Sequence, residues 1–415
     1  MNIAIVGAGI TGISTALEFA RDGHQVTVYE QMNAAAEAAS FAPGGWLAPL
    51  AAHSLTTPGM GMPLKQLQSG TGLLQASTMI GSATWRWMRQ WKKLEKQATQ
   101  LQDQSFVTAL HAMGHYSASL RWNANEDPAH TAEQKMGNLV LLRSPQEVAF
   151  WNAQTPSLQA HGVACQLLNA EQVQALEPGL GQEIAWLNAL HFPQGETINP
   201  RLWSHYLRTQ ALALGVNMHT GTAVEKISTQ PCGIHIAGQV LRFDAVVLCT
   251  GTHHDLLKPL GLHLPTMPIW GYSITTPVRD PLLAPRAAIM DWAEQATISR
   301  MGQRIRITAG MEMGSTADAT HHNPTLQRMY RLLNDWFPGG AQLSSPQVQV
   351  WRGARAYLPD GLPAVGATPH PGIWLNVAHG SHGASLATGC ARALADMVQG
   401  HDPALDMQAF SPLRF

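Results

Sequence analysis

The spacing of apolar residues changes twice within residues 2–30. Residues 3–6 form a short apolar run typical of a strand, and apolar side chains then recur at helical spacing over 13–20. Gly23 ends the helical pattern, and a second β-branched run follows at 26–29. The chain is therefore predicted to begin with a β-α-β unit.

Later segments repeat these two patterns. An apolar run over 243–248 stops at Thr250-Gly251, which is typical of a buried parallel strand whose carboxyl end faces a nucleotide. Residues 266–310 alternate with a period near two between turn residues, which predicts an antiparallel sheet. Helices are also expected at 85–96 with continuation over 101–120, and at 147–160, 202–214, 321–337 and 384–398; strands are expected at 137–142 and 372–377, with a strand pair around Gly221.

Two stretches rich in glycine and proline are expected to be loops. Residues 31–50 are small enough to lie close against a ligand, and Ser40 can offer a hydroxyl there; an ordinary surface turn is the alternative. Residues 53–65 contain Pro-Gly-Met-Gly-Met-Pro and are expected to form an irregular segment or a mobile lid.

The predicted helix at 85–96 combines tryptophans with five arginines and lysines. Trp87, Met88, Trp91 and Leu94 recur at helical spacing. We expect these side chains to pack on the protein's own domain and to leave a solvated basic face, because such faces are common. A peripheral contact with a membrane surface is the alternative.

The amino-acid composition limits the classes of protein to which the chain can belong. The 415 residues are 45% hydrophobic and 13% charged, which suffices for two ordinary cores and argues against disorder. A formal net charge of −1 argues against a nucleic-acid partner. The four cysteines show no C-x-x-C spacing, so we expect neither a metal site nor a disulfide framework. We expect a cytoplasmic protein, or one peripheral on the inner membrane, because the sequence shows neither a signal peptide nor a long apolar run.

The turn of the first β-α-β unit carries the spacing G-x-G-x-x-G. Gly7 permits the tight turn, Gly9 lets a pyrophosphate approach the backbone, and Gly12 allows close packing of helix on strand. Glu30 ends the second strand, where a carboxylate can accept hydrogen bonds from both ribose hydroxyls. The fingerprint indicates a dinucleotide, and its position at the start of the sequence favours FAD over NAD.

A second glycine-rich turn, AHGSHG at 378–383, precedes the last predicted helix. Its backbone amides and the helix N-terminus would face a group at the carboxyl end of the sheet, where they can stabilise negative charge on a reduced flavin. His379 and His382 can be considered as general bases, but their glycine-rich setting favours backbone binding of flavin.

Segments in order along nearly the whole chain resemble the D-amino-acid-oxidase superfamily of FAD-dependent oxidoreductases, most closely its bacterial D-amino-acid dehydrogenase small-subunit group. They include VGAGITGISTALEFARDGHQVTVYE, SFAPGGWLAP, DAVVLCTGTHHDLLKPLG, WRGARAYLPDGLPAVG and LNVAHGSHGASLATG. The resemblance implies an α/β fold, with a Rossmann-like doubly wound FAD-binding domain and a second α+β substrate domain built on an antiparallel sheet. The implied FAD-binding domain takes 1–80, 165–258 and 350–415, and the substrate domain takes 81–164 and 259–349.

The resemblance also implies the cofactor site. Its relatives of the sarcosine-oxidase type tether flavin through a cysteine near residue 355, where this chain has none, so noncovalent FAD is expected. The implied cofactor-binding residues are Gly7, Gly9, Ile10, Thr11, Gly12, Glu30, Gln31, Ser40, Val224, Thr250, Gly251, Gly380, Ser381, His382 and Gly383.

Two residues are implied to act on the substrate. Arg355 matches the family's arginine that grips the substrate carboxylate, and a planar guanidinium can do so with two hydrogen bonds. Tyr272 matches a position from which a phenol can donate to the same carboxylate. A structural ion pair of Arg355 with Asp360 is the alternative. The chain has Ala-Arg-Ala-Tyr-Leu-Pro-Asp-Gly at 354–361 where the group commonly has Leu-Arg-Pro-x-Thr-Pro-Asp-Gly, and Tyr357 with the neighbouring changes leaves the side-chain preference undefined.

The resulting hypothesis is oxidative deamination of an amino acid, most simply a D-amino acid. Hydride would pass from the α-carbon to flavin N5, and the imino acid would hydrolyse to a 2-oxo acid and ammonia. The alternatives are a glycine, sarcosine or cyclic imino-acid oxidase on the same fold, and a non-catalytic or tRNA-modifying flavoprotein. The electron acceptor can be oxygen, a quinone or a partner protein.

Overall fold

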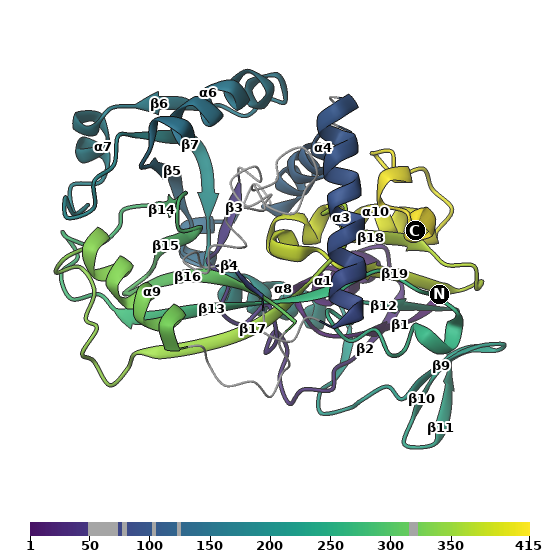
Figure 1. Ribbon diagram of the computed structural model, residues 1–415. Coiled ribbons are helices and arrows are strands. Elements are labelled where there is room, and N and C mark those ends of the chain that lie inside the picture. The colour runs from purple at the N-terminus through teal and green to yellow at the C-terminus, as the bar shows by residue number, and fades with distance from the viewer. Residues whose placement is uncertain (49–73, 77–80, 102–104, 123–125, 315–322) are drawn as a thin grey trace.

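The computed structural model describes residues 1–48, 74–76, 81–101, 105–122, 126–314 and 323–415. A six-stranded sheet and a ten-stranded sheet form the two halves of the molecule (Figure 1). The expected irregular segment at 53–65 lies outside the described residues.

The six-stranded sheet contains the N-terminal β-α-β unit. Its order is β18-β19-β12-β1-β2-β8, and neighbouring strands are parallel except for β18 and β19. The predicted strand that ends at Thr250-Gly251 is confirmed as a parallel neighbour of the first strand. The bounds are β1 (Asn2–Val6), β2 (Gln25–Tyr29), β8 (Asn217–His219), β12 (Ala245–Leu248), β18 (Ala364–Ala367) and β19 (Ile373–Val377).

The two faces of this sheet are covered differently. Ile3 and Ile5 of β1 pack with the helices of one face, whereas Ala4 and Val6 pack with Ile234 of a small three-stranded sheet on the other face. Alternate side chains of a strand leave opposite faces, so a buried strand of continuous apolar residues serves both cores. The helices are α1 (Ile10–Arg21), α4 (Ser105–Arg121), α8 (Pro200–Ala213) and α10 (Gly383–Val398); the small sheet comprises β9 (Lys226–Thr229), β10 (Cys232–Ile236) and β11 (Gln239–Arg242).

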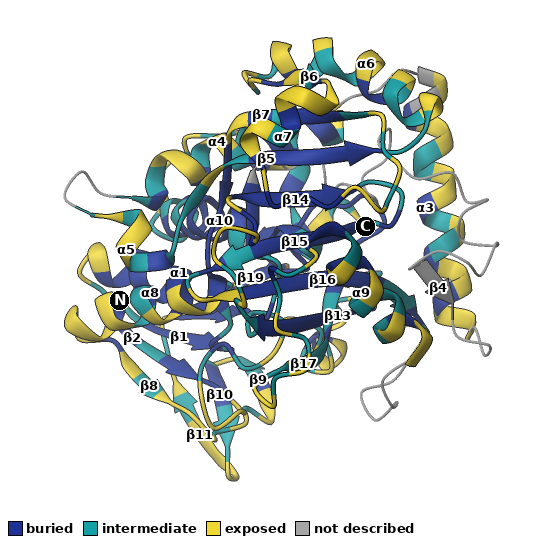
Figure 2. Cartoon of the chain, turned by 90° about the vertical axis from the view of Figure 1, so that its left-hand side faces the viewer, coloured by how far each residue is buried: buried dark blue, intermediate teal, exposed yellow. Residues whose placement is uncertain are grey.

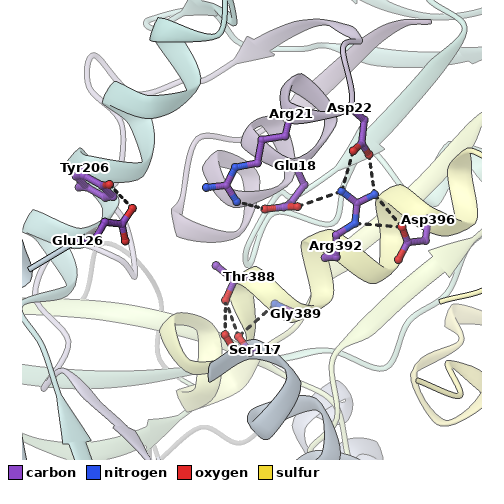
Figure 3. A network of polar contacts seen from close by, with 10 residues as sticks. All are labelled: Glu18, Arg21, Asp22, Ser117, Glu126, Tyr206, Thr388, Gly389, Arg392 and Asp396. Atoms are coloured by element: carbon purple, nitrogen blue, oxygen red, sulfur yellow. Dashed lines mark hydrogen bonds and ion pairs between the residues drawn. The ribbon is translucent and has the colours of Figure 1, made fainter. Parts of the chain in front are cut away.

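Polar contacts join the N-terminal and C-terminal helices (Figure 3). The guanidinium of Arg392 on α10 lies 2.6 Å from Asp22 and 3.2 Å from Glu18 at the end of α1. Ser117 of α4 bonds the hydroxyl of Thr388 on α10 at 2.7 Å. These contacts hold α10 beside α1, so that the N-termini of both helices lie at the carboxyl ends of the parallel strands.

The ten-stranded sheet supplies the wall opposite those helix ends. The path runs β17-β13-β16-β15-β14-β5-β7-β3, with β4 paired to β16 and β6 paired to β7. The pairs among β13, β14, β15 and β16 are antiparallel, as predicted for residues 266–310. The bounds are β3 (Trp46–Ala48), β4 (Leu74–Ala76), β5 (Lys135–Leu142), β6 (Gln166–Leu168), β7 (Asn188–Thr197), β13 (Met267–Pro277), β14 (Ala288–Asp291), β15 (Ala296–Met301), β16 (Arg304–Met313) and β17 (Gln349–Tyr357).

Of the remaining helices, α3, α6, α7 and α9 lie around this second half, whereas α5 packs beside α8 (Figures 1 and 2). Helix α9 packs Met329, Leu333 and Trp336 into the core beneath β13 and β16, and its outer side is exposed (Figure 2). The bounds are α3 (Ser82–Leu101), α5 (Pro128–Ala132), α6 (Pro145–Ala160), α7 (Ala170–Leu176) and α9 (Asn323–Trp336), with short 3₁₀ turns η2 (Lys258–Leu260), η3 (Gly380–His382), η4 (Gln408–Phe410) and η5 (Pro412–Arg414).

Helix α3 follows the favoured interpretation of its sequence. Trp87 and Trp91 are buried and pack with Met267, Met313 and Tyr357. The five cations on the opposite side are exposed: Arg86, Arg89, Lys92, Lys93 and Lys96. No described helix is long and apolar enough to span a membrane.

The predicted strand pair around Gly221 is wrong in its pairing. Strand β8 pairs in parallel with β2, whereas β9 pairs with β10 in the separate three-stranded sheet. Between them, the N–H of Gly221 donates to the carbonyl of Met32 and that of Thr222 to the carbonyl of Glu30. The chain therefore continues past the end of β2 and does not turn back on itself.

Strand pairing also bears on the predicted domain limits. Strands β6 and β7 lie within 165–258, and β17 opens the range 350–415, yet all three strands belong to the ten-stranded sheet. Their pairing partners favour placing residues 166–197 and the strand before Leu358 with the substrate-domain segments. The division into two domains itself stays a prediction.

Candidate active site

A cavity of about 600 Å³ lies where the carboxyl ends of the parallel strands face the ten-stranded sheet. This volume is within the usual range for ligand pockets. Most of the residues predicted from the sequence line it: Gly7, Gly9, Ile10, Thr11, Glu30, Gln31, Ser40, Val224, Thr250, Gly251, Arg355, Gly380, Ser381 and Gly383. Gly12, His382 and Tyr272 are not among the lining residues.

The three fingerprint glycines have three different surroundings. Gly7 has φ +105°, and a Cβ there would lie 2.5 Å from the carbonyl oxygen of Cys249. A Cβ on Gly12 would lie 1.9 Å from the carbonyl oxygen of Gly7, so this glycine serves packing of helix on turn. A Cβ on Gly9 would meet only the Oγ of Ser40, at 3.5 Å. The open side of Gly9 is therefore the place where a ligand can approach the backbone.

The N-terminus of α1 is prepared for an anion. No acidic residue lies in its first turn, and its cap residue Gly9 offers no side chain. The N–H of Ile10 donates to the Oγ of Ser40 at 3.0 Å, which leaves the serine proton available as a donor. Unpaired N–H groups and the helix dipole attract phosphate at such a site.

Glu30 is held in position by the backbone. Its Oε2 accepts from the N–H of Ala8 at 2.7 Å, and its Oε1 accepts from the N–H of Met32 at 2.8 Å. Each carboxylate oxygen retains a second lone pair for a ligand hydroxyl. The predicted contact with ribose therefore fits a side chain that is already ordered and lines the cavity.

Three buried polar atoms in the cavity wall have no hydrogen-bond partner within the described residues. They are Thr250 Oγ1, Asn376 Oδ1 and His379 Nε2. A buried polar group without a partner costs about 1–3 kcal/mol, so such atoms at a cavity mark places where a polar ligand restores the lost bonds.

The C-terminal turn carries two buried histidines. Burial lowers the pKa of His379 to about 3 and that of His382 to about 4. Both imidazoles are therefore neutral near pH 7 and weak as bases, in agreement with the expected backbone role of the turn. His379 lines the cavity, whereas His382 lies behind it and interacts with His111 of α4.

Arg355 lies on β17, and its guanidinium extends over Gly271 of the neighbouring strand β13. A Cβ on Gly271 of the neighbouring strand would lie 3.0 Å from its Nη1, so the absence of a side chain there gives the guanidinium room. Among the described residues, no carboxylate forms an ion pair with Arg355. A half-buried cation at a cavity wall is a binding group for a ligand carboxylate.

The alternative partner proposed for this arginine is excluded by the structure. Asp360 pairs with Arg414, whose Nε lies 2.6 Å from Oδ2 and whose Nη2 lies 3.2 Å from Oδ1. The same carboxylate accepts the N–H of Leu362 at 3.1 Å. Asp360 thus anchors the C-terminal residues.

Tyr272 and Arg355 leave opposite faces of the sheet, because Tyr272 pairs with Arg352 and residues 352 and 355 point to opposite sides of β17. Its hydroxyl donates to Oε2 of Glu312 at 2.8 Å, and its ring packs in the core with Met329 of α9. Arg352, opposite Tyr272 in the register, lies 3.4 Å from the same carboxylate. Donation to a substrate carboxylate would require this hydroxyl to leave Glu312, and that role stays a prediction.

Several lining residues were not predicted. Gly44, Gly45 and Trp46 lie within 31–50, which was expected to be a loop and for which only Ser40 had been named; Trp46 begins β3, and the glycine pair before it was the available signal. Others come from the antiparallel wall, where an alternating pattern gives no indication of which residues meet a ligand; they include Gln295, Thr297, Thr308 and Met311.

A family model described as FAD dependent oxidoreductase matches residues 2–397. The chain belongs to the FAD-dependent oxidoreductase family. Two relatives named D-amino acid dehydrogenase are similar along their whole lengths. That of Methylobacterium sp. (strain 4-46) is 31% identical, with 100% of this chain and 99% of the relative covered. That of Cereibacter sphaeroides is 33% identical, with 98% and 93% covered.

Solved structures of two other enzymes share the fold. Glycine oxidase from Geobacillus kaustophilus has a TM-score of 0.74 at 21% identity, covering 100% of this chain and 98% of the other. L-proline dehydrogenase from P. horikoshii has a TM-score of 0.69 at 18% identity, covering 100% and 97%. The α/β fold and FAD as cofactor are therefore confirmed, and the open side of Gly9, the helix N-terminus and Glu30 fit that cofactor. Within the described residues, no cluster of three or more His, Cys, Asp or Glu could hold a metal ion.

Proposed function

We propose that this flavoenzyme oxidises D-amino acids to 2-oxo acids and ammonia. The observation that carries the proposal is Arg355, a cation in the wall of the cofactor cavity whose expected structural partner is bound elsewhere. The two D-amino acid dehydrogenases that match along the whole chain support the substrate class. The stereochemistry rests on these relatives, because Arg355 would bind the carboxylate of either enantiomer.

Arg355 would bind the substrate carboxylate with two parallel hydrogen bonds and so fix the α-carbon relative to the cofactor. FAD, when bound, supplies the hydride acceptor for the C–H bond of that carbon. Gly271 leaves space beside the guanidinium, and Met311 and Trp46 contribute large apolar side chains to the cavity lining. The chain's contribution is therefore mainly orientation and electrostatic complementarity.

The decisive measurement is anaerobic bleaching of the bound flavin by individual amino acids. We expect D-amino acids to bleach it and their L-enantiomers to leave it oxidised. A protein that stays yellow with every D-, L- and N-substituted amino acid contradicts the proposal. Bleaching by glycine, sarcosine or proline alone would instead support the alternative oxidase functions.

Arg355→Leu tests the carboxylate anchor. Two charge-assisted bonds contribute about 3–5 kcal/mol, so kcat/KM should fall roughly 100- to 5,000-fold. Arg355→Lys should recover only part of this loss, because an ammonium cannot form the paired contacts. Arg300→Leu is the matched control, since Arg300 bonds the carbonyls of Gly302 and Pro281 outside the cavity. The D-alanine amide, which has no carboxylate, should lose no rate in the leucine variant; a rate loss as large as that for D-alanine refutes the assignment.

We also propose that helix α3 is the surface by which the protein contacts an anionic membrane. This contact would bring the flavoenzyme close to its electron acceptor. Trp85 is 61% exposed beside the five exposed cations, while the buried Trp87 and Trp91 connect the same helix to β17. Exposed tryptophan among cations is typical of a helix at a lipid interface. Vesicles with anionic headgroups should bind the protein, and Trp85→Ala or high salt should weaken that binding; equal binding to neutral vesicles contradicts the proposal.

A further inference from the structure

Tyr357 connects the strand of Arg355 to the turn at the start of α10. It is the last residue of β17 and only 3% exposed. Its hydroxyl lies 2.5 Å from the Oγ of Ser381, which lines the cofactor cavity, whereas Tyr357 itself does not. Any effect of Tyr357 on a bound cofactor must therefore pass through the turn.

The tyrosine ring also fixes the backbone of that turn. A Cβ on Gly380 would lie 2.7 Å from Cε1 and 2.8 Å from Cδ1 of the ring, so the ring packs directly against the glycine. Gly380 has φ +54°, in the left-handed region that favours glycine. Neither η3 nor α10 has a side-chain cap, and α10 has no acid in its first turn. The hydrogen bond between Tyr357 and Ser381 thus holds the start of α10, which has no side-chain cap of its own.

Tyr357 is also held in a buried hydrophobic cluster. It belongs to this cluster with Trp87, Trp91 and Met313, and the Nε1 of Trp87 donates to the Tyr357 carbonyl at 3.2 Å. On β17, residues 355 and 357 leave the same face, about 6.6 Å apart along the strand. A single rigid strand therefore carries both the carboxylate anchor and the support of the turn.

We propose that Tyr357 is a positioning residue that holds the Gly380–Gly383 turn in place for the flavin, at a fixed offset from Arg355. This inference rests on the proposed function for the role of Arg355. The N–H groups and dipole of the ordered turn favour negative charge on the reduced cofactor, so loosening the turn weakens binding of the reduced form more than that of the oxidised form.

The test measures FAD binding and redox potential in the full-length protein. Tyr357→Phe removes only the hydroxyl, and Ser381→Ala removes its partner. Each should raise the Kd for FAD about three- to ten-fold and lower the two-electron midpoint potential of bound flavin by about 14–30 mV, the equivalent of a three- to ten-fold preferential loss of reduced flavin. The double variant should be no worse than either single variant, because both remove the same bond.

Tyr206→Phe is the matched control. The Tyr206 hydroxyl on α8 donates to Glu126, and neither residue lines the cavity, so its loss should leave the Kd and the potential unchanged. A Tyr357→Phe protein that is less stable to heat but keeps the wild-type Kd and potential overturns the proposal. An effect of Ser381→Ala without one of Tyr357→Phe overturns it as well. Neither measurement needs an amino acid, so the result is independent of the substrate assay.

Discussion

Alanine substitutions at Gly9 and Gly12 should separate the two functions of the G-x-G-x-x-G turn, which are cofactor binding at Gly9 and helix packing at Gly12. A Cβ on Gly12 would lie 1.9 Å from a backbone carbonyl oxygen, which cannot rotate away. Relief requires α1 to move from β1, and we expect Gly12→Ala to lose at least 3 kcal/mol of unfolding free energy, at the upper end of overpacking costs. A Cβ on Gly9 would meet only a serine oxygen at 3.5 Å, and its φ of −67° suits alanine. The weaker helix cap of alanine should cost Gly9→Ala no more than about 1 kcal/mol.

Binding should show the opposite order of sensitivity. Gly9→Ala places a methyl group where the pyrophosphate approaches, so its FAD dissociation constant should rise at least about 100-fold, equivalent to about 2.7 kcal/mol. Urea unfolding of the FAD-free protein and fluorescence titration with FAD measure the two quantities separately. A Gly9→Ala protein with wild-type affinity would refute the placement of the ligand on the open side of Gly9. A Gly12→Ala protein as stable as wild type would refute the argument from close packing.

Two further predictions concern buried charge. Because burial holds the pKa of His111 and His382 at about 4 and that of His379 at about 3, against 6.5 when unfolded, the unfolded chain binds more protons below pH 6.5. Unfolding free energy should therefore fall as pH decreases from 6.5 towards 4, by about 1.4 kcal/mol per pH unit for each histidine, and His379→Gln should reduce that slope; a flat profile contradicts it. Glu196 bonds the buried Arg121, Trp122 Nε1 at 2.9 Å and Gln134 Nε2 at 2.7 Å. Glu196→Ala should cost about 3–5 kcal/mol by thermal or urea unfolding, and partial recovery by Arg121→Met on that background would confirm the stranded cation as the cause.

The sequence predicted those parts of the site that local geometry determines. Gly7, Gly9, Gly12 and Glu30 belong to one β-α-β unit, and the roles assigned to the glycines agree with their surroundings. Contacts that depend on pairing of distant strands were not accessible. Tyr272 faces Glu312 because it leaves the same face of β13 as Trp270, which pairs with Glu312 of β16, and no pattern within either strand reveals that pairing.

The same limit applies to segments whose partners lie elsewhere in the chain. Strands β8 and β9 were both expected, but their membership of different sheets depends on β2 and β10. The loop with Ser40 was expected to approach a ligand. Thr297 and Thr308 line the same cavity only because the ten-stranded sheet packs opposite that loop in the folded protein. Which polar residues face the cavity is decided by tertiary packing and not by periodicity.

The position of β1 between β2 and β12 has a consequence for how the protein is made. Val6 pairs with Leu248, which the ribosome adds 242 residues later. At 5–20 residues per second, β1 and β2 wait roughly 12–50 s with one edge of β1 unpaired. Helix α10, whose start completes the flavin turn, is translated later still. The cofactor site thus closes only after α10 has been translated, and the nascent chain must protect an apolar strand edge until then.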